Sequence, residues 1–338
     1  MNKVYFKNDY SELAAPEVLA YMAKISNGHY NGYGLDEICE SAAGRIRREL
    51  KYDNCDVHFM GGGTQTNLVM LDQILRSYEA VAAVSTGHIN VHESGSIERT
   101  GHKIEPLPSH NGKMCAADLE DLIRHRTDEH KVKIGAAYIS QSTETGTVYS
   151  KKELQELKRV CSDNGIYLFI DGARLGVALM CDGSDLKMSD MPYLCDAFYI
   201  GATKNGGMLG EALVIVNDDL KPHFRNAMKQ HGALLAKGFV VGAQFDALFT
   251  DGLYYRLAEH SNSMALNLKK KLQEKGIELT IDSPTNQQFI RLPNEKVKEL
   301  EKNFAFEIWE DGPEYTVIRL VCSWATAEEE IDKLLMAL

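Results

Sequence analysis

A lysine and an aspartate each follow a short apolar run in this chain, and together they suggest one kind of chemistry. Asp171 comes directly after the run 166–170, and Lys204 comes shortly after the run 197–200. Both runs are short enough to be buried strands, so both polar residues fall at strand carboxyl ends, the edge where α/β sheets bind ligands. A lysine that forms a Schiff base and an acid that pairs with a pyridinium nitrogen would make a pyridoxal phosphate site.

Each residue taken alone has a plainer interpretation. A lysine after a strand is usually a solvated loop residue, and the pair Asp171-Gly172 after a strand is usually a turn. Short motifs of this kind are weak evidence singly. The order of the two residues, together with the motifs described below, favours the catalytic interpretation.

Composition narrows the class of protein. The chain has 338 residues, of which 44% are hydrophobic and 25% charged, as in soluble globular proteins. Its formal net charge of -11 repels nucleic acid and anionic lipid, and its N-terminus lacks the apolar core of a signal peptide. The seven cysteines form no CxxC pair, which favours reduced thiols and a cytoplasmic location over disulfides or a zinc site.

The middle of the chain alternates between strand and helix patterns. Strands are expected at 56–60, 80–85, 133–140 and 166–170, and helices at 67–78, 117–126 and 150–164. This alternation predicts an α/β domain with a mostly parallel sheet covered by helices. A further strand at 211–216, close behind Lys204, is expected to run antiparallel.

The two ends of the chain differ from the middle. Residues 1–35 have few periodic apolar positions and are interpreted as an N-terminal arm. A long helical pattern covers 239–275, and strand patterns then follow at 277–281, 288–292, 306–309 and 315–322, before a helix that begins near Thr326. We therefore expect a large domain over 36–245 and a smaller C-terminal α+β domain over 246–338.

Two segments could contact a flat, phosphorylated ligand. Gly61-Gly62-Gly63-Thr64 lies between a predicted strand and a predicted helix, where it is either a phosphate-binding turn or merely a flexible one. It matches neither the dinucleotide-binding nor the Walker pattern. His88 could stack on a cofactor ring or be a surface residue without a role, and the HExxH zinc motif is absent from its segment.

Two arginines could bind a carboxylate. Arg319 lies inside the apolar strand pattern 317–321, where a cation is costly to bury unless it is paired. A guanidinium suits bidentate binding of a substrate carboxylate, but an internal salt bridge is the commoner arrangement. The same alternatives apply to Arg174.

With these segments in this order, the chain resembles the threonine aldolase family of the β-eliminating lyase group, which are pyridoxal-phosphate enzymes of fold type I. The resemblance extends over nearly the whole chain. It is carried by Asn8-Asp9, Tyr33-Gly34-Leu35-Asp36, Gly62-Gly63-Thr64-Gln65-Thr66-Asn67, His88-Ile89 with Glu93, Asp171-Gly172-Ala173-Arg174, Thr203-Lys204 and Arg319-Leu320-Val321.

The resemblance implies roles for the matched residues. Lys204 would form the Schiff base, Asp171 would pair with the pyridine nitrogen and His88 would stack on the ring. The phosphate would be held by Gly63, Thr64 and Thr203. The substrate would be bound by Asn8, Tyr33, Arg174 and Arg319. The resemblance further implies a homodimer or homotetramer with shared active sites, in which Tyr33 and the arm reach a neighbour's site.

The chain departs from the family pattern at several positions. Asn8 and Gly62 stand where the family usually has serine. Glu144 occupies the place of a histidine that helps to handle the substrate hydroxyl, and the segment around Lys237 lacks the usual Arg-Gln pair. These changes leave the cofactor assignment intact and bear on the choice of substrate.

The expected activity is cleavage of L-threonine, L-allo-threonine or a related β-hydroxy-α-amino acid to glycine and an aldehyde. The base that removes the hydroxyl proton would be His88 or Glu144. The alternatives are β-elimination or transamination on the same scaffold, or a non-catalytic protein that binds the cofactor or a partner.

Overall fold

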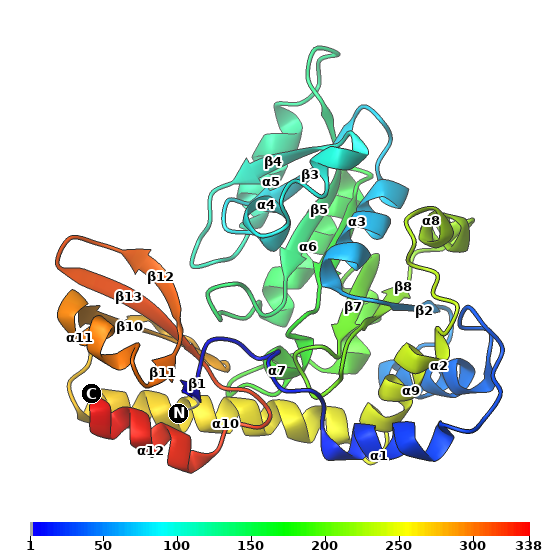
Figure 1. The fold of residues 1–338 in the computed structure, drawn as a ribbon. Helices are drawn as coiled ribbons and strands as arrows, with labels where there is room; N and C mark the ends of the chain where they lie inside the picture. Colours follow the sequence, from blue (N-terminus) through cyan, green and yellow to red (C-terminus); the bar gives the residue numbers. More distant parts are fainter. Residues whose placement is uncertain (1–2) are drawn as a thin grey trace.

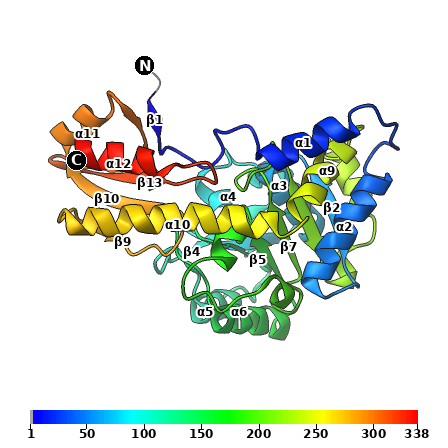
Figure 2. The same cartoon turned by 90° about the horizontal axis from the view of Figure 1, so that it is seen from below.

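The computed structural model describes residues 3–338 and shows two bodies joined by one long helix (Figure 1). Met1 and Asn2, the first residues of the expected arm, lie outside the described residues. The larger body is built on a seven-stranded sheet and the smaller one on a four-stranded antiparallel sheet. The joining helix, α10 (Leu253–Glu274), crosses from one body to the other, as the view from below shows (Figure 2).

The large sheet is mostly parallel. Its strands are β2 (Asp56–Met60), β3 (Glu79–Val84), β4 (Lys103–Leu107), β5 (Lys133–Ser140), β6 (Tyr167–Asp171), β7 (Ala197–Gly201) and β8 (Glu211–Ile215). Their spatial order is β2-β8-β7-β6-β5-β3-β4. The strands from β3 to β7 pair in parallel, and β8 runs antiparallel to both of its neighbours. The expected sheet and the antiparallel strand behind Lys204 are both confirmed.

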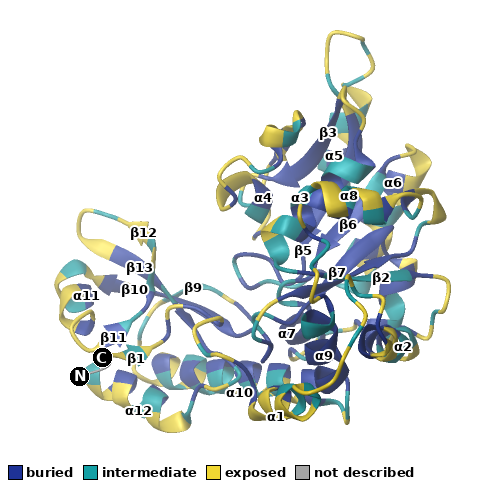
Figure 3. Cartoon of the chain, turned by 45° about the vertical axis from the view of Figure 1, so that its right-hand side comes forward, coloured by how far each residue is buried: buried dark blue, intermediate teal, exposed yellow. Residues whose placement is uncertain are grey.

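Helices cover both faces of this sheet. On one face lie α3 (Gly63–Ile74), α4 (His88–Val91) and α8 (Phe224–Gln230). On the other lie α2 (Glu37–Leu50), α5 (Ala116–Arg124), α6 (Lys151–Asp163), α7 (Leu175–Leu179) and α9 (Phe239–Leu248). Because both faces are buried, the strands are continuous apolar runs rather than alternating ones. Figure 3 shows the central strands buried and the outer helices partly exposed.

The smaller body holds Arg319. Its sheet has the order β12-β13-β10-β9, formed by β9 (Leu279–Ile281), β10 (Gln287–Pro293), β12 (Glu307–Asp311) and β13 (Tyr315–Val321). The helices α11 (Asn294–Leu300) and α12 (Glu328–Ala337) accompany it, and β1 (Val4–Tyr5) pairs in parallel with β11 (Phe304–Ala305). In this way the start of the chain is tied to the C-terminal body. Short 3-10 turns lie at Glu98–Thr100, Met188–Tyr193 and Asp218–Leu220.

The sequence-based prediction did not include β4 or α7, and three further elements differ from it. The arm contains a helix, α1 (Pro16–Ile25), which buries only Val18 and therefore shows little apolar periodicity. The helix after the glycine turn begins at Gly63 rather than at 67. The pattern over 239–275 is two helices, α9 and α10, because Asp251 and Gly252 adopt left-handed φ angles of 49° and 68° and end the regular winding.

The division of the chain at residue 245 remains our proposal. α9, in which that residue lies, packs its apolar residues into the core of the large body. α10 contributes Leu253 and Tyr254 to that core and Leu268 and Leu272 to the core of the small body. Since one helix belongs to both cores, we expect its two ends to hold the bodies at a defined distance.

The helices and the cysteines bear on the environment of the protein. Within residues 3–338, none of the helices combines the length and the apolar character that crossing a bilayer requires. All seven cysteines are free thiols, and all but Cys115 are buried.

A largely buried histidine makes the fold sensitive to acid. His58 on β2 packs its ring against Phe224 of α8, with ring centroids 4.9 Å apart, and burial lowers its pKa from 6.5 to about 4. Between these two values the unfolded chain binds a proton at His58 that the folded protein does not bind. Stability is therefore lost as the pH falls through this window.

We predict that protonation of His58 lowers the free energy of unfolding of the cofactor-free protein by about 2 kcal/mol between pH 7 and pH 5. His58→Leu should remove this loss. Urea denaturation at both pH values measures it. His130→Leu, at an exposed histidine, is the control and should respond to acid as the parent does. An unchanged acid response in His58→Leu would contradict the prediction.

Candidate active site

Asp171 ends β6 as a buried carboxylate with four hydrogen-bond donors. Its Oδ1 accepts the hydroxyl of Tyr199 and the N–H of Ala173, the latter at 3.0 Å. Its Oδ2 accepts the hydroxyl of Tyr138 at 2.5 Å and Nδ2 of Asn67 at 3.1 Å. The donors come from β7, β5, the turn after β6, and α3, so four elements converge on one side chain.

These contacts keep Asp171 ionised. Burial by itself would raise its pKa, but the electrostatic interaction with the His88 ring and the hydrogen bonds from Tyr138 and Tyr199 outweigh burial, and the pKa is lowered. Burial and the nearby Asp171 charge in turn raise the pKa of both tyrosines well above the usual value, so their hydroxyls stay protonated donors. A fixed negative charge at this depth can stabilise a protonated ring nitrogen.

The turn after Asp171 requires glycine. The end of β6 passes so close to β7 that a Cβ on Gly172 would overlap the carbonyl oxygen of Tyr199. Gly201 N–H donates to Gly172 O at 3.0 Å, which ties the ends of the two strands together. The Asp-Gly segment thus brings the acid next to the loop that carries the lysine.

Lys204 lies in a tight loop after β7. Asn205 and Gly207 both donate their N–H to Ala202 O at 2.9 Å, which closes the loop, and the amine of Lys204 lies 5.9 Å from the ring centroid of Tyr10. Burial and then the positive charge of Arg174 lower the pKa of Lys204, against the opposing pull of nearby acids. A lowered pKa leaves more of the amine neutral, the form that attacks an aldehyde.

His88 begins α4, and its ring is oriented by an acid. Nδ1 lies 2.8 Å from Oε1 of Glu93, whose side chain is fully buried. The same Oε1 accepts Nδ2 of Asn67 at 2.8 Å, and Oε2 accepts Ser96 Oγ at 2.8 Å. Because Glu93 is an acceptor, we assign the imidazole proton to Nδ1, which leaves Nε2 as a base. Asn67 links His88 to Asp171 through Glu93.

Glu144 lies beside His88, in the loop that follows β5. Its Oε1 accepts Ser140 Oγ at 2.6 Å and the backbone N–H of His88 at 3.1 Å. Burial raises the pKa of this carboxyl. A raised pKa makes a carboxylate a stronger base close to neutral pH.

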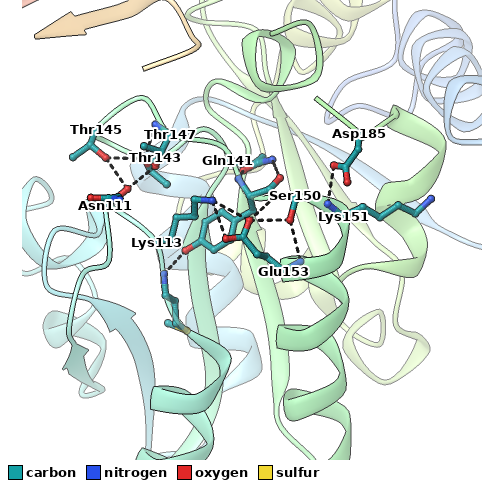
Figure 4. Close-up of polar contacts among 12 residues, drawn as sticks. Asn111, Lys113, Gln141, Thr143, Thr145, Thr147, Ser150, Lys151, Glu153 and Asp185 are labelled. Atoms are coloured by element: carbon teal, nitrogen blue, oxygen red, sulfur yellow. Dashed lines mark hydrogen bonds and ion pairs between the residues drawn. The ribbon is translucent and has the colours of Figure 1, made fainter. Parts of the chain in front are cut away.

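The loop that carries Glu144 is held by a group of polar contacts (Figure 4). The side-chain amide of Gln141 both donates to and accepts from the backbone of Tyr149 at 3.0 Å. Thr147 Oγ1 donates to Asn111 O at 2.6 Å, and Thr143 N–H donates to Thr147 O at 2.9 Å. These bonds hold the segment between β5 and α6 in one conformation, so the position of Glu144 is fixed by the fold.

The glycine turn forms the N-terminus of α3. Gly62 precedes the helix, while Gly63 and Thr64 are its first residues, so their N–H groups lack partners within the helix and can bind an anion. Thr203 Oγ1 accepts Gly210 N–H at 3.0 Å and donates to Glu211 Oε1 at 3.1 Å. Across the strands Glu211 pairs with both the end of β2 and the end of β7, which places the glycine turn beside the lysine loop.

The two arginines differ in what they already bind. Arg174 forms a bidentate pair with Asp9, at 2.7 and 3.0 Å. Arg319 donates through Nη1 to Gln287 Oε1 at 3.2 Å, lies 5.4 Å from the ring of Trp309, and keeps a buried Nε without a partner among the described residues. Burial and then the charge of Arg174 lower the pKa of Arg319. An incoming carboxylate would relieve this repulsion.

Two expected substrate-binding residues make other contacts within this chain. The Oδ1 atom of Asn8 accepts the N–H of Tyr10 and the hydroxyl of Ser11, so it stabilises its own turn. Tyr33 accepts an Arg225 hydrogen bond at its carbonyl, and Lys229 lies over its ring. Their roles toward substrate therefore remain predictions.

The sequence analysis quoted Asn67 and Glu93 among the motifs of the family resemblance but gave them no role. It did not single out four other residues that support the site: Tyr138, Ser140, Tyr199 and Glu211. Tyr138 and Tyr199 did leave a signal, since each is a polar-tipped residue within an otherwise apolar strand. The motif that contains Asn67 did not reveal its contact with Asp171, because that contact joins positions that are far apart in the chain.

Comparisons with known proteins agree with this geometry. A family model described as beta-eliminating lyase matches residues 8–294. A low specificity L-threonine aldolase of Pseudomonas sp. (strain NCIMB 10558) is 31% identical, over 97% of this chain and 95% of that protein. The solved structure of a Leishmania major threonine aldolase is 45% identical with a TM-score of 0.97, over 98% of this chain and 97% of that one. An aspartate aminotransferase from Thermus thermophilus, 16% identical with a TM-score of 0.73 over 99% of this chain and 91% of that one, shows likeness of fold alone.

We predict that Gly172→Ala destabilises the protein by at least about 2 kcal/mol, because the new methyl group cannot be accommodated without moving β6 away from β7. Denaturant unfolding measures the loss. Gly44→Ala, in the middle of α2 with only ordinary contacts for its methyl group, is the control and should stabilise by about 0.5–1 kcal/mol. A Gly172→Ala protein as stable as the parent would show that Gly172 and the carbonyl oxygen of Tyr199 are farther apart than described.

Proposed function

This chain belongs to the β-eliminating lyase family, and on that basis we propose that it is a pyridoxal-phosphate-dependent lyase that cleaves a β-hydroxy-α-amino acid, with L-threonine or L-allo-threonine as the reference substrate, into glycine and an aldehyde. Its fold is fold type I, as expected. The observation that carries the proposal is the pair formed by the ionised, buried Asp171 and the neighbouring Lys204 with its lowered pKa. The near-full-length aldolase relatives support the same reaction.

The residues present fit pyridoxal phosphate. Asp171 offers a fixed charge for a protonated ring nitrogen, and Lys204 offers an amine that is partly neutral. The N-terminus of α3 at Gly63 and Thr64 offers unpaired N–H groups for a phosphate, and the ring of His88, held by Glu93, offers a flat surface. When bound, the cofactor supplies an electron sink conjugated to the nitrogen of the amino acid.

Arg319 is our candidate for binding the substrate α-carboxylate. Its buried Nε is free of partners within residues 3–338, and its guanidinium already bears repulsion from Arg174. Because two hydrogen bonds already pair Arg174 with Asp9, the role we propose for Arg174 is to hold the N-terminal segment near Lys204.

His88 and Glu144 are our candidates for the base. Either can take the proton from the β-hydroxyl as the Cα–Cβ bond breaks and the aldehyde leaves. The Cα atom, which keeps the electron pair, then accepts a proton to give glycine. Glu144 accepts a hydrogen bond from the backbone N–H of His88, which supports the proposal that both residues serve the same site. The raised pKa of Glu144 favours it for the hydroxyl proton.

We propose that the protein works in the cytoplasm as a homodimer or homotetramer with shared active sites. The free cysteines are consistent with a reducing compartment. Leu13, Tyr10 and Leu35 in the N-terminal segment are 67, 53 and 64% exposed, which is the kind of surface that another subunit covers. We expect Tyr33 to reach toward the site of that subunit.

The activity is tested by incubating the purified protein with L-threonine and pyridoxal phosphate. Equal amounts of glycine and acetaldehyde are expected. A 2-oxo acid with ammonia would indicate β-elimination instead, and a protein that binds the cofactor without turnover would contradict the proposal.

We predict that Asp171→Asn keeps the fold and weakens cleavage far more than it weakens cofactor binding. The amide cannot stabilise a protonated ring nitrogen as a carboxylate does, and charge-assisted hydrogen bonds are roughly twice as strong as neutral ones. Turnover and the dissociation constant of pyridoxal phosphate are measured on the same preparation. Turnover at the parent rate would show that Asp171 is only a turn residue.

We predict that Arg319→Ala lowers kcat/KM for every amino acid by roughly 10²-fold or more, since loss of a buried charged partner costs about 2–5 kcal/mol. Steady-state kinetics with two amino acids of different side chain measure the loss. Glu105→Gln, at a buried carboxyl on β4 that pairs with Arg126, is the control. A loss confined to one substrate would exclude carboxylate binding.

We predict that Glu144→Gln slows the cleavage of β-hydroxy substrates while leaving the binding of glycine largely intact, because glycine has no hydroxyl to deprotonate. Glycine affinity is measured spectroscopically and threonine cleavage kinetically. Equal losses in both would mean that Glu144 supports the site structurally and would leave His88 as the base.

A further inference from the structure

Glu211 is a buried acid between the glycine turn and the lysine loop. It is the first residue of β8 and only 3% exposed. Across the sheet it pairs with Met60 on one side and with Gly201 on the other. Met60 directly precedes the turn into α3, and Gly201 ends the strand that leads to Lys204. Glu211 therefore lies where the two segments expected to hold a phosphate come together.

The two carboxyl oxygens of Glu211 have different surroundings. Oε1 accepts the hydroxyl of Thr203 at 3.1 Å. Oε2 is buried and finds no hydrogen-bond partner in the part of the chain that the structure describes. A buried polar atom without a partner is costly, and such atoms in native proteins usually meet a ligand or water. Since Oε1 is an acceptor, a proton on this carboxyl belongs on Oε2.

The charges around Glu211 favour its neutral form. Burial raises its pKa to about 8, and the positive charge of Lys204 and hydrogen bonds from Thr203 and the Ala202 backbone only partly oppose this. The nearby Asp171 raises it further. Tyr199 of β7 and Tyr254 of α10, the other titratable groups that sense Glu211, are both neutral because their own pKa values are raised. At neutral pH the carboxyl therefore keeps its proton in most molecules.

We propose that Glu211 binds the phosphate of the cofactor as a neutral carboxylic acid, donating a hydrogen bond from Oε2 to a phosphate oxygen. This inference rests on the proposed function, because it requires pyridoxal phosphate in the site. A phosphate dianion needs donors, and Gly62 at the turn supplies no hydroxyl. An ionised Glu211 would repel the dianion in this low-dielectric place, whereas the acid form contributes a hydrogen-bond donor.

The test uses pyridoxine 5′-phosphate, which carries the ring and the phosphate but has no aldehyde to react with Lys204. Its affinity for the full-length, cofactor-free protein is measured calorimetrically at pH 7 and pH 9. Ionisation of Glu211 should lower the affinity of the parent by roughly tenfold over this range, beyond the change that the ligand's own titration causes. Glu211→Gln always carries a donor, so it should match the parent at pH 7 and bind about tenfold more tightly than the parent at pH 9.

Two further variants separate the possible causes. Glu211→Leu removes both the charge and the donor, so it should bind more weakly than Glu211→Gln at both pH values, with no added pH dependence. Glu105→Gln should behave as the parent. Thermal unfolding checks that each variant is folded.

The outcomes are distinct. A ratio of parent to Glu211→Gln affinity that does not change with pH overturns the inference, as does a Glu211→Gln protein that binds poorly throughout, since the site would then require the anion. Failure of the parent and of every variant to bind either pyridoxine 5′-phosphate or pyridoxal phosphate at pH 7 would instead overturn the proposed function.

Discussion

The site depends on keeping the charge of Asp171 buried at the end of β6. Removing a carboxylate from water costs several kcal/mol, and only well-placed donors offset this. Tyr138, Tyr199 and Asn67 supply three of them, the N–H of Ala173 supplies the fourth, and three different secondary-structure elements must meet to bring the side chains together. The parallel arrangement of β5, β6 and β7 accomplishes this, since their carboxyl ends lie at one edge of the sheet.

Burial also shifts the pKa values of the other ionisable groups of the site, but in different directions. Burial lowers the pKa of Lys204 and raises those of Glu144 and Glu211, while Asp171, which has the donors, stays ionised. Groups of opposite protonation state can therefore coexist within one small volume, which proton transfer at neutral pH requires. The differences follow from which side chains have partners: Asp171 has four donors, whereas one oxygen of Glu211 has none among the described residues.

The sequence was sufficient to predict the strands that position the reactive groups, and to predict Asp171 and Lys204 at or after the ends of those strands. β5, β6 and β7 are continuous apolar runs, so both their presence and the location of Asp171 and Lys204 could be predicted. α1 could not be predicted, because it buries a single residue and its surface pattern resembles that of a loop. The break between α9 and α10 was missed because left-handed φ angles at Asp251 and Gly252 leave the apolar periodicity on either side intact. The contacts of Asn67, Tyr138 and Tyr199 with Asp171 could not be predicted, because they join positions distant in the chain.

The central claim is that Lys204, beside an ionised Asp171, holds pyridoxal phosphate. It is tested most directly by reducing the cofactor-loaded protein with borohydride and mapping the modified peptide by mass spectrometry, with Lys204→Ala as the matched control. The account predicts a pyridoxyl group on the peptide that contains Lys204 and its loss in the control. A pyridoxyl group on Lys237 or on any other lysine of the parent protein would contradict it.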